Sequence, residues 1–159
     1  MRRFWTRFSS LPIALLVVWT VLAPSASAAT RVAVSGSFTQ VDFAITDSRT
    51  AGDLTFFSFT ETDVLDGSLT GTSELTGECI VFPSQEAMCK ATETFTGTFD
   101  GTAGTLTFLD VVRLNLATGT VSGQFVITDG SGGLASVRGI GSFSGAGTSG
   151  TYSGTLTVG

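Results

Sequence analysis

The chain has 159 residues, among them thirteen acidic residues, eight basic residues and no histidine. The missing histidine excludes Ser-His and Cys-His nucleophilic mechanisms and removes the commonest transition-metal ligand. The acidic excess argues against nucleic acid and anionic membrane surfaces as partners, because both are bound through clustered Lys and Arg side chains.

The first 28 residues have the three parts of a secretory signal peptide. Three arginines form a cationic start, residues 11–23 form an apolar stretch, and Ala26-Ser27-Ala28 is an A-x-A cleavage site. The apolar stretch is shorter than the roughly 20 residues that a membrane-spanning helix needs. A retained anchor and a twin-arginine signal are the alternatives. We therefore expect a secreted or extracytoplasmic protein with a cleaved segment 1–28, one domain over 29–159, and no membrane attachment after cleavage.

The expected domain 29–159 consists of short strands separated by glycine-rich turns. Apolar and polar side chains alternate with a period of two, most clearly in residues 92–99, 119–127 and 151–158. Turn sequences such as Asp100-Gly101 separate these runs. The pattern predicts eight strands, over residues 32–46, 54–65, 68–82, 88–99, 104–114, 118–128, 136–146 and 150–158.

Eight successive strands joined by short turns predict an all-β fold: a single antiparallel, up-and-down, lipocalin-like barrel. Closure into a barrel removes the exposed edges that a long open meander would have. Glycines inside the predicted strands favour strong coiling or close contacts within a narrow barrel. These glycines are Gly71, Gly97, Gly123, Gly139, Gly141 and Gly154. A two-sheet β-sandwich is the alternative fold.

The two cysteines, Cys79 and Cys89, both lie in the expected domain and flank Pro83. An exported chain meets an oxidising environment, so the pair is predicted to form a structural disulfide. A redox site is the alternative. It is disfavoured because the spacing is not C-x-x-C and Lys90 is the one cationic residue adjoining either cysteine.

Two carboxylates share predicted strand faces with apolar residues. Glu93 alternates in phase with Phe95, and Asp110 alternates in phase with Leu106 and Phe108. If these faces line the barrel interior, the low dielectric raises the pKa of both carboxyls, as suits a general acid or base. Arg138 is the first candidate for a compensating charge. The alternatives are that these faces point outward into a subunit contact, or that the carboxylates lie near a rim in water.

No cofactor or metal site is expected. A zinc site would depend on two cysteines predicted to be paired and on carboxylates, and no D-x-D-x-D-G calcium loop occurs. The candidate ligand-binding residues are Glu93, Phe95, Asp110 and Arg138, and no catalytic residue is assigned. Association between copies of the chain is left open.

Two glycine-rich stretches carry a family resemblance. Residues 94–106 (TFTGTFDGTAGTL) contain a G-T-F-D-G turn, and residues 129–143 (DGSGGLASVRGIGSF) contain an R-G-x-G strand entry. Together they resemble an uncharacterised bacterial family whose barrel is similar to allene oxide cyclase and, more distantly, to plant dirigent proteins. The resemblance implies an eight-stranded barrel with an apolar cavity that holds a hydrophobic molecule. Glu93 and Arg138 match family positions, whereas Asp110 stands where a His is expected in many members.

Three functions are compatible with these features. The chain could bind a small hydrophobic ligand without reaction, it could be a cofactor-free cyclase or isomerase, or it could be a structural or surface-interaction protein with no ligand. Binding is favoured over catalysis because labile intermediates are usually made inside cells and because histidine is missing.

Overall fold

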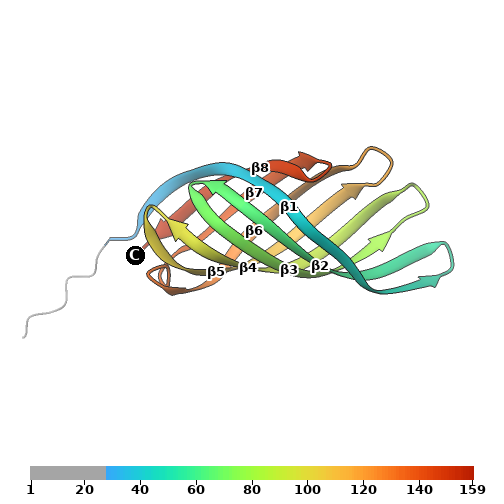
Figure 1. Cartoon of the computed structure of the whole chain (residues 1–159), viewed down its shortest axis with the longest axis horizontal. Coiled ribbons are helices and arrows are strands. Elements are labelled where there is room, and N and C mark those ends of the chain that lie inside the picture. Colours follow the sequence, from blue (N-terminus) through green and yellow to red (C-terminus); the bar gives the residue numbers. More distant parts are fainter. Residues whose placement is uncertain (1–27) are drawn as a thin grey trace, which may run out of the picture.

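The computed structural model describes residues 28–159, so the expected signal peptide lies, except for Ala28, outside the described residues. Eight antiparallel strands follow one another along the chain (Figure 1). They are β1 (Thr30–Ala51), β2 (Leu54–Gly67), β3 (Leu69–Val81), β4 (Glu86–Phe99), β5 (Thr102–Asn115), β6 (Thr120–Gly132), β7 (Arg138–Ala146) and β8 (Ser149–Val158). All eight predicted strands are present, and the largest differences are at the ends of β1 and β6, which extend to Ala51 and Gly132.

Each strand pairs with its neighbours along the chain, and β1 pairs with β8 to close the barrel. The predicted up-and-down barrel is therefore confirmed, and the sandwich alternative is wrong. The turns after β1, β3, β5 and β7 lie at one end, which we call the open end (Figure 1). The C-terminus and the connections after β2, β4 and β6 lie at the other, the closed end. No helix within residues 28–159 is long and apolar enough to cross a membrane.

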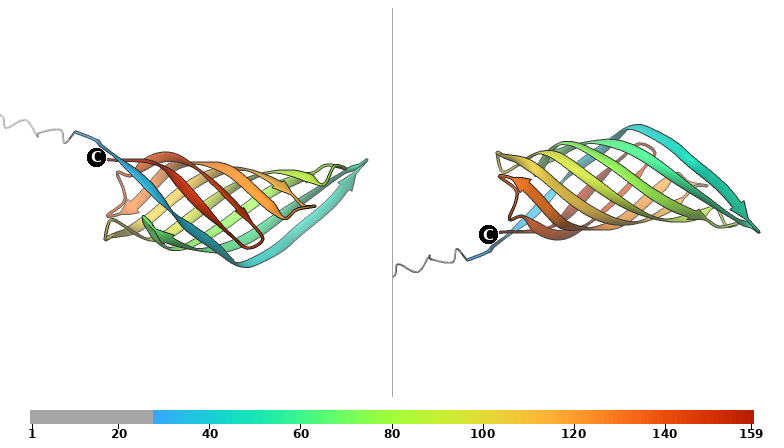
Figure 2. Two further views of the ribbon diagram at one scale, coloured as in Figure 1. Left: turned by 90° about the horizontal axis from the view of Figure 1, so that it is seen from above. Right: turned by 90° about the horizontal axis from the view of Figure 1, so that it is seen from below.

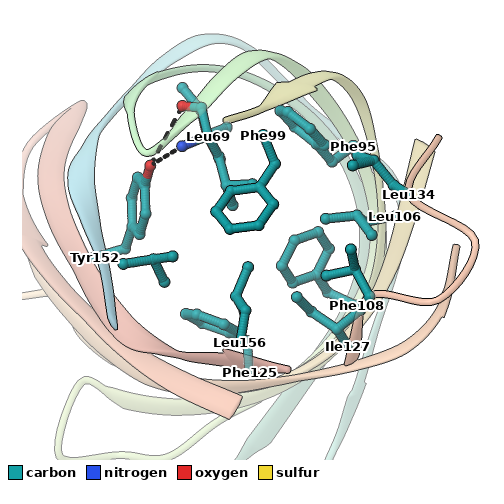
Figure 3. Close-up of a cluster of buried hydrophobic side chains, with 13 residues drawn as sticks. Leu69, Phe95, Phe99, Leu106, Phe108, Phe125, Ile127, Leu134, Tyr152 and Leu156 are labelled. Atoms are coloured by element: carbon teal, nitrogen blue, oxygen red, sulfur yellow. Dashed lines mark hydrogen bonds between the residues drawn. The ribbon is translucent and has the colours of Figure 1, made fainter. Parts of the chain in front are cut away.

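Buried apolar side chains fill the closed end and point toward the barrel axis (Figure 3). Leu134 and Val137, from the connection between β6 and β7, are each 1% exposed and cover this core. The Tyr152 hydroxyl accepts a hydrogen bond of 2.8 Å from the Leu69 amide, so this buried polar group is satisfied. The core comprises Val34, Leu65, Leu69, Phe95, Phe99, Leu106, Phe108, Phe125, Ile127, Leu134, Val137, Tyr152 and Leu156.

Inward-facing glycines leave the space in which aromatic rings lie. A Cβ atom at Gly141 would be 2.2 Å from Cζ of Phe125, and one at Gly123 would be 2.3 Å from Cζ of Phe143. Both distances are far below van der Waals contact, so neither ring could keep its place beside a larger residue. The expected role of strand glycines in close contacts inside a narrow barrel is confirmed at these positions.

Cys79 and Cys89 face each other directly across β3 and β4, with their Sγ atoms 1.97 Å apart. The predicted disulfide is therefore present. Both residues are buried, and they fix the hairpin between β3 and β4 near the open end. A disulfide of this kind fits an oxidising compartment outside the cytoplasm.

The β1–β2 hairpin projects beyond the other turns of the open end (Figure 2). Strand β8 pairs with β1 as far as Thr39, whereas β2 continues alongside β1 to Ala51. The register shifts between Gln40 and Asp42, and again between Ile45 and Asp47. A shift of this kind marks a β-bulge, which bends the strand and changes which alternate residues face inward.

A cavity with a carboxyl belt as the candidate functional site

A cavity of about 500 Å³ occupies the barrel between the closed-end core and the open end. The inward-facing positions of β2 to β6 supply most of its wall, because alternate residues of a strand point to one side. Aromatic and aliphatic side chains dominate this wall, among them Phe57, Phe59, Leu75, Val112, Leu114 and Val121. A cavity of this size and lining is typical of sites for small organic molecules.

The mouth of the cavity lies at the open end. Leu116 and Thr148, which belong to turns of that end, are part of the lining. Phe43 and Ile45, on the projecting part of β1, also line the cavity, yet they are 45% and 57% exposed. The Phe43 ring stacks on Phe59, with centroids 5.6 Å apart. Apolar residues therefore extend from the interior to the rim, where a hydrophobic molecule would enter.

Four carboxyl groups line the cavity between its apolar ends: Glu61 and Asp63 on β2, Glu93 on β4 and Asp110 on β5. We call these four residues the carboxyl belt. The strand register places them along one side of the wall, since Glu61 and Glu93 both pair with Leu75 of the intervening strand β3. Glu93 and Asp110 lie on adjacent strands as diagonal neighbours, because Asp110 pairs with Ala91.

Glu93 and Asp110 form the inner pair of the belt. Burial raises the pKa of Glu93 to about 8, and the nearby Asp110 charge adds to this effect, while a hydrogen bond donated by the Ser73 hydroxyl opposes it. Burial likewise raises the pKa of Asp110 to about 7. Asp110 is 3% exposed, and apart from a hydrogen bond shared with the Glu93 carboxyl its oxygens have no partner in the described chain. Two buried carboxyls this close cannot both ionise without a large cost, so the pair retains a proton near neutral pH.

Glu61 and Asp63 form the outer pair. Burial raises the pKa of Glu61 to about 7, and the Asp63 charge raises it further, against a hydrogen bond from the Gln40 side chain. The pKa of Asp63 is also raised, mainly by burial. Asp63 is 7% exposed, and apart from a hydrogen bond shared with the Glu61 carboxyl its Oδ1 atom has no partner within residues 28–159. The belt therefore holds proton donors and unused acceptor atoms inside an apolar chamber.

Positive charge does not reach the belt from the described chain. The five basic side chains of residues 28–159 all lie at exposed positions, and none lines the cavity. Within the same range, no three Cys, Asp or Glu side chains converge closely enough to hold a metal ion. The four carboxyls are spread over the wall of the cavity. No basic side chain of residues 28–159 lies beside them to balance their negative charge.

The family described as "Protein of unknown function (DUF3224)" matches residues 34–156 of the chain. The chain belongs to the DUF3224 family. No curated protein matches the sequence. Among solved structures, the chain is similar to a protein of unknown function from the DUF3224 family of Shewanella oneidensis MR-1. The TM-score is 0.62 at 17% identity, and the match covers 80% of this chain and 96% of that chain.

This result confirms part of the resemblance seen in the sequence. The glycine-rich stretches 94–106 and 129–143 lie within the matched residues, and the family is one of unknown function. At 17% identity the solved structure supports the barrel fold alone. Neither match extends the resemblance to allene oxide cyclase or to dirigent proteins.

The structure brings together two of the four predicted ligand-binding residues, Glu93 and Asp110. Phe95 faces inward as predicted, but it is fully buried in the closed-end core and is not among the cavity-lining residues. Arg138 lies on the outer face, where its Nη2 atom is 3.4 Å from Oδ1 of Asp129. The expected pairing of Arg138 with Glu93 is thus corrected: Glu93 accepts a hydrogen bond from Ser73 instead.

Sequence reasoning did not identify Glu61, Asp63 and Ser73 as part of the site. The signal for the first two was present, since Phe57, Phe59, Glu61, Asp63 and Leu65 alternate in phase along β2. The same signal was present for Ser73, which alternates in phase with Leu69 and Leu75 along β3, although serine is common on exposed strand faces. It is nevertheless completely buried, beneath the Glu93 carboxyl.

Proposed function

We propose that the chain is an exported binding protein that holds a small hydrophobic molecule inside its barrel. The single observation that supports this most strongly is the cavity of about 500 Å³, with its mainly aromatic and aliphatic wall. The exposed apolar side chains of Phe43 and Ile45 at the mouth give such a molecule a path of apolar contacts from solvent to the interior. Membership of the DUF3224 family is compatible with this function and does not specify the ligand.

An uncharged fluorophore, N-phenylnaphthylamine, provides the test of cavity binding. Burying about 250 Å² of aromatic surface contributes about 6 kcal/mol, which corresponds to a Kd of roughly tens of micromolar. Ala91→Trp should abolish the fluorescence increase, because Ala91 is a buried, cavity-lining residue of β4 and the larger ring would fill the space.

The matched control is Thr92→Trp, which places the same ring on the exposed outer face of β4. This variant should bind the fluorophore as the unmodified domain does. Equal binding to both variants would contradict a site inside the barrel, and no binding to any form would contradict the proposed function.

The proposal of export depends on the signal-like segment 1–28 and is supported by the disulfide between Cys79 and Cys89. Protein recovered from the culture medium or the cell envelope of the native host is expected to begin at or near Ala29. N-terminal sequencing measures this directly, and membrane-embedded material beginning at Met1 would contradict cleavage.

A second candidate is a cofactor-free cyclase or isomerase of the kind that the sequence resemblance to allene oxide cyclase suggests. The observation in its favour is the coupled pair of Glu93 and Asp110, whose pKa values of about 8 and about 7 suit proton transfer near neutral pH. Mass spectrometry of small molecules that co-purify with the protein separates the two functions. When that compound is added back to the protein, a binder leaves it unchanged, whereas an enzyme converts it to an isomer of equal mass that chromatography before the mass spectrometer resolves.

A further inference from the structure

We propose that the ligand is an amphiphilic cation, an organic amine whose ammonium group binds the carboxyl belt while its apolar body fills the rest of the cavity. This inference rests on the proposed function and specifies its ligand class. Three observations carry it: an apolar chamber of about 500 Å³, four carboxyls on its wall, and no Lys or Arg among its lining residues in the described chain.

Hydrogen bonding at the belt is incomplete in a way that matches an ammonium group. Both oxygens of Asp110 and the Oδ1 atom of Asp63 are buried, and the only hydrogen-bond partners they have in the described chain are the neighbouring belt carboxyls, Glu93 and Glu61. Unsatisfied buried acceptors are costly, and charge-assisted hydrogen bonds are the strongest way to satisfy them. A primary ammonium group has three donors and no acceptor, which complements the carboxyl oxygens of the belt once its protons are displaced.

The spacing of the belt favours an organic cation over a metal ion. A metal site needs several ligands that converge on one point, and no three such side chains do so within residues 28–159. The carboxyls are instead spread over β2, β4 and β5 between apolar patches of wall. Aromatic side chains of the same wall, such as Phe59 and Phe108, add surfaces that attract a cation and pack against an apolar body.

Binding of a cation to the belt should make the affinity depend on pH. The titratable groups that face the cavity are Glu61, Asp63, Glu93, Asp110 and Tyr152. An entering cation takes the place of a proton held by the belt, and that proton leaves to solvent. Amine affinity should therefore rise with pH between about pH 6 and pH 8, by up to about tenfold per unit for one displaced proton. An uncharged ligand displaces no proton, so its affinity should not change over the same range.

Three probes that share one ring system test the head-group preference: naphthylmethylamine, naphthylmethanol and naphthylacetate. Isothermal titration calorimetry near pH 8 is expected to give an amine affinity at least about tenfold above that of the alcohol, with the carboxylate weakest. Titrations near pH 6.5, below the raised pKa values of the belt, in two buffers of different ionisation enthalpy should show release of about one proton per amine bound. Equal affinities for amine and alcohol would overturn the inference while leaving the proposed function intact. Failure of every probe to bind would overturn both.

The double variant Glu93→Gln with Asp110→Asn keeps the shape of the belt and removes its inner charges. Its amine and alcohol affinities should agree within about twofold, and proton release should disappear. The matched control is Glu74→Gln, which removes a carboxyl from the exposed outer face of β3 and should keep the full amine preference. Persistence of the preference both in this double variant and in Glu61→Gln with Asp63→Asn would show that the belt does not set it and would overturn the inference. If the double variant does not fold, Glu61→Gln with Asp63→Asn applies the same test to the outer pair.

Discussion

Urea denaturation of the domain is expected to show its highest stability near pH 4 and to lose several kcal/mol of unfolding free energy by pH 9. Most proteins lose stability in acid because paired carboxylates become protonated. Here the opposite sign is expected, since burial without a cationic partner raises the pKa values of Glu61, Glu93 and Asp110 to about 7, about 8 and about 7.

The unfolding free energy falls as the pH rises because the belt takes up protons on folding. In the unfolded chain these carboxyls have their ordinary pKa values of 4.5 for Glu and 3.8 for Asp, whereas in the folded barrel they keep their protons to neutral pH. Their full stabilising contribution is present below about pH 4, and it is lost as the pH rises through 7 and 8, where the folded barrel must ionise the belt. The chain has no histidine that could add a slope of its own in this window.

Glu93→Gln with Asp110→Asn should flatten this pH dependence and make the variant more stable than the unmodified domain at pH 9. Glu74→Gln, on the outer face, should leave the pH dependence unchanged. Unfolding free energies from urea curves at pH 5, 7 and 9 supply the measurement. A stability that rises from pH 5 to pH 9 would show that the belt is compensated in solution.

Phe95→Ala is expected to reduce the unfolding free energy by about 3–5 kcal/mol. The Phe95 side chain is 0% exposed, and its ring lies against the inward glycines Gly71 and Gly97, so truncation leaves a void that backbone atoms cannot easily fill. Typical domains have about 5–15 kcal/mol of stability, so this single change removes a large part of the total.

Phe56→Ala is the matched control, because Phe56 belongs to the outer face of β2 and is only partly buried. It loses the contact with Arg49, whose guanidinium carbon lies 4.2 Å from the ring centroid, at an expected cost of about 1 kcal/mol. Urea denaturation midpoints of the two variants are compared at pH 5, where the belt is protonated and does not itself lower the stability. Equal losses would mean that the closed-end core does not dominate stability. Phe95→Ala should still bind N-phenylnaphthylamine, since Phe95 is not a cavity-lining residue.

The sequence could predict the barrel because most strands have one buried face, which imposes a period of two that is visible without any contact information. The ends of β1 were not predictable in the same way. The first of its two bulges, between Gln40 and Asp42, moves the inward positions from Gln40 to Phe43, so the alternation breaks in the middle of the strand. Strand β6 also extends past the expected turn at Asp129, with a further register shift opposite Thr107 and Phe108.

The candidate site was predictable where it depended on strand faces alone. Glu93 and Asp110 share faces with buried aromatic residues, and both line the cavity. Arg138 precedes the inward glycines of β7 by an odd number of positions, so the same alternation places it on the outer face. The position of an inward-facing residue along the barrel axis was not predictable, because it is set by the tilt and stagger of the strands. For that reason Phe95 could not be assigned to the closed-end core and away from the cavity.

The projecting part of β1 has a consequence for how the molecule behaves among copies of itself. Beyond Thr39 this strand pairs with β2 on one side and no longer with β8, so its other side presents backbone amides and carbonyls that another strand could join. Such an edge is a starting point for aggregation unless it is protected. Here the two bulges twist it, and Asp42, Asp47 and Arg49 place charges along it. These features weaken edge-to-edge pairing along the side of the segment that is open to solvent at the mouth of the cavity.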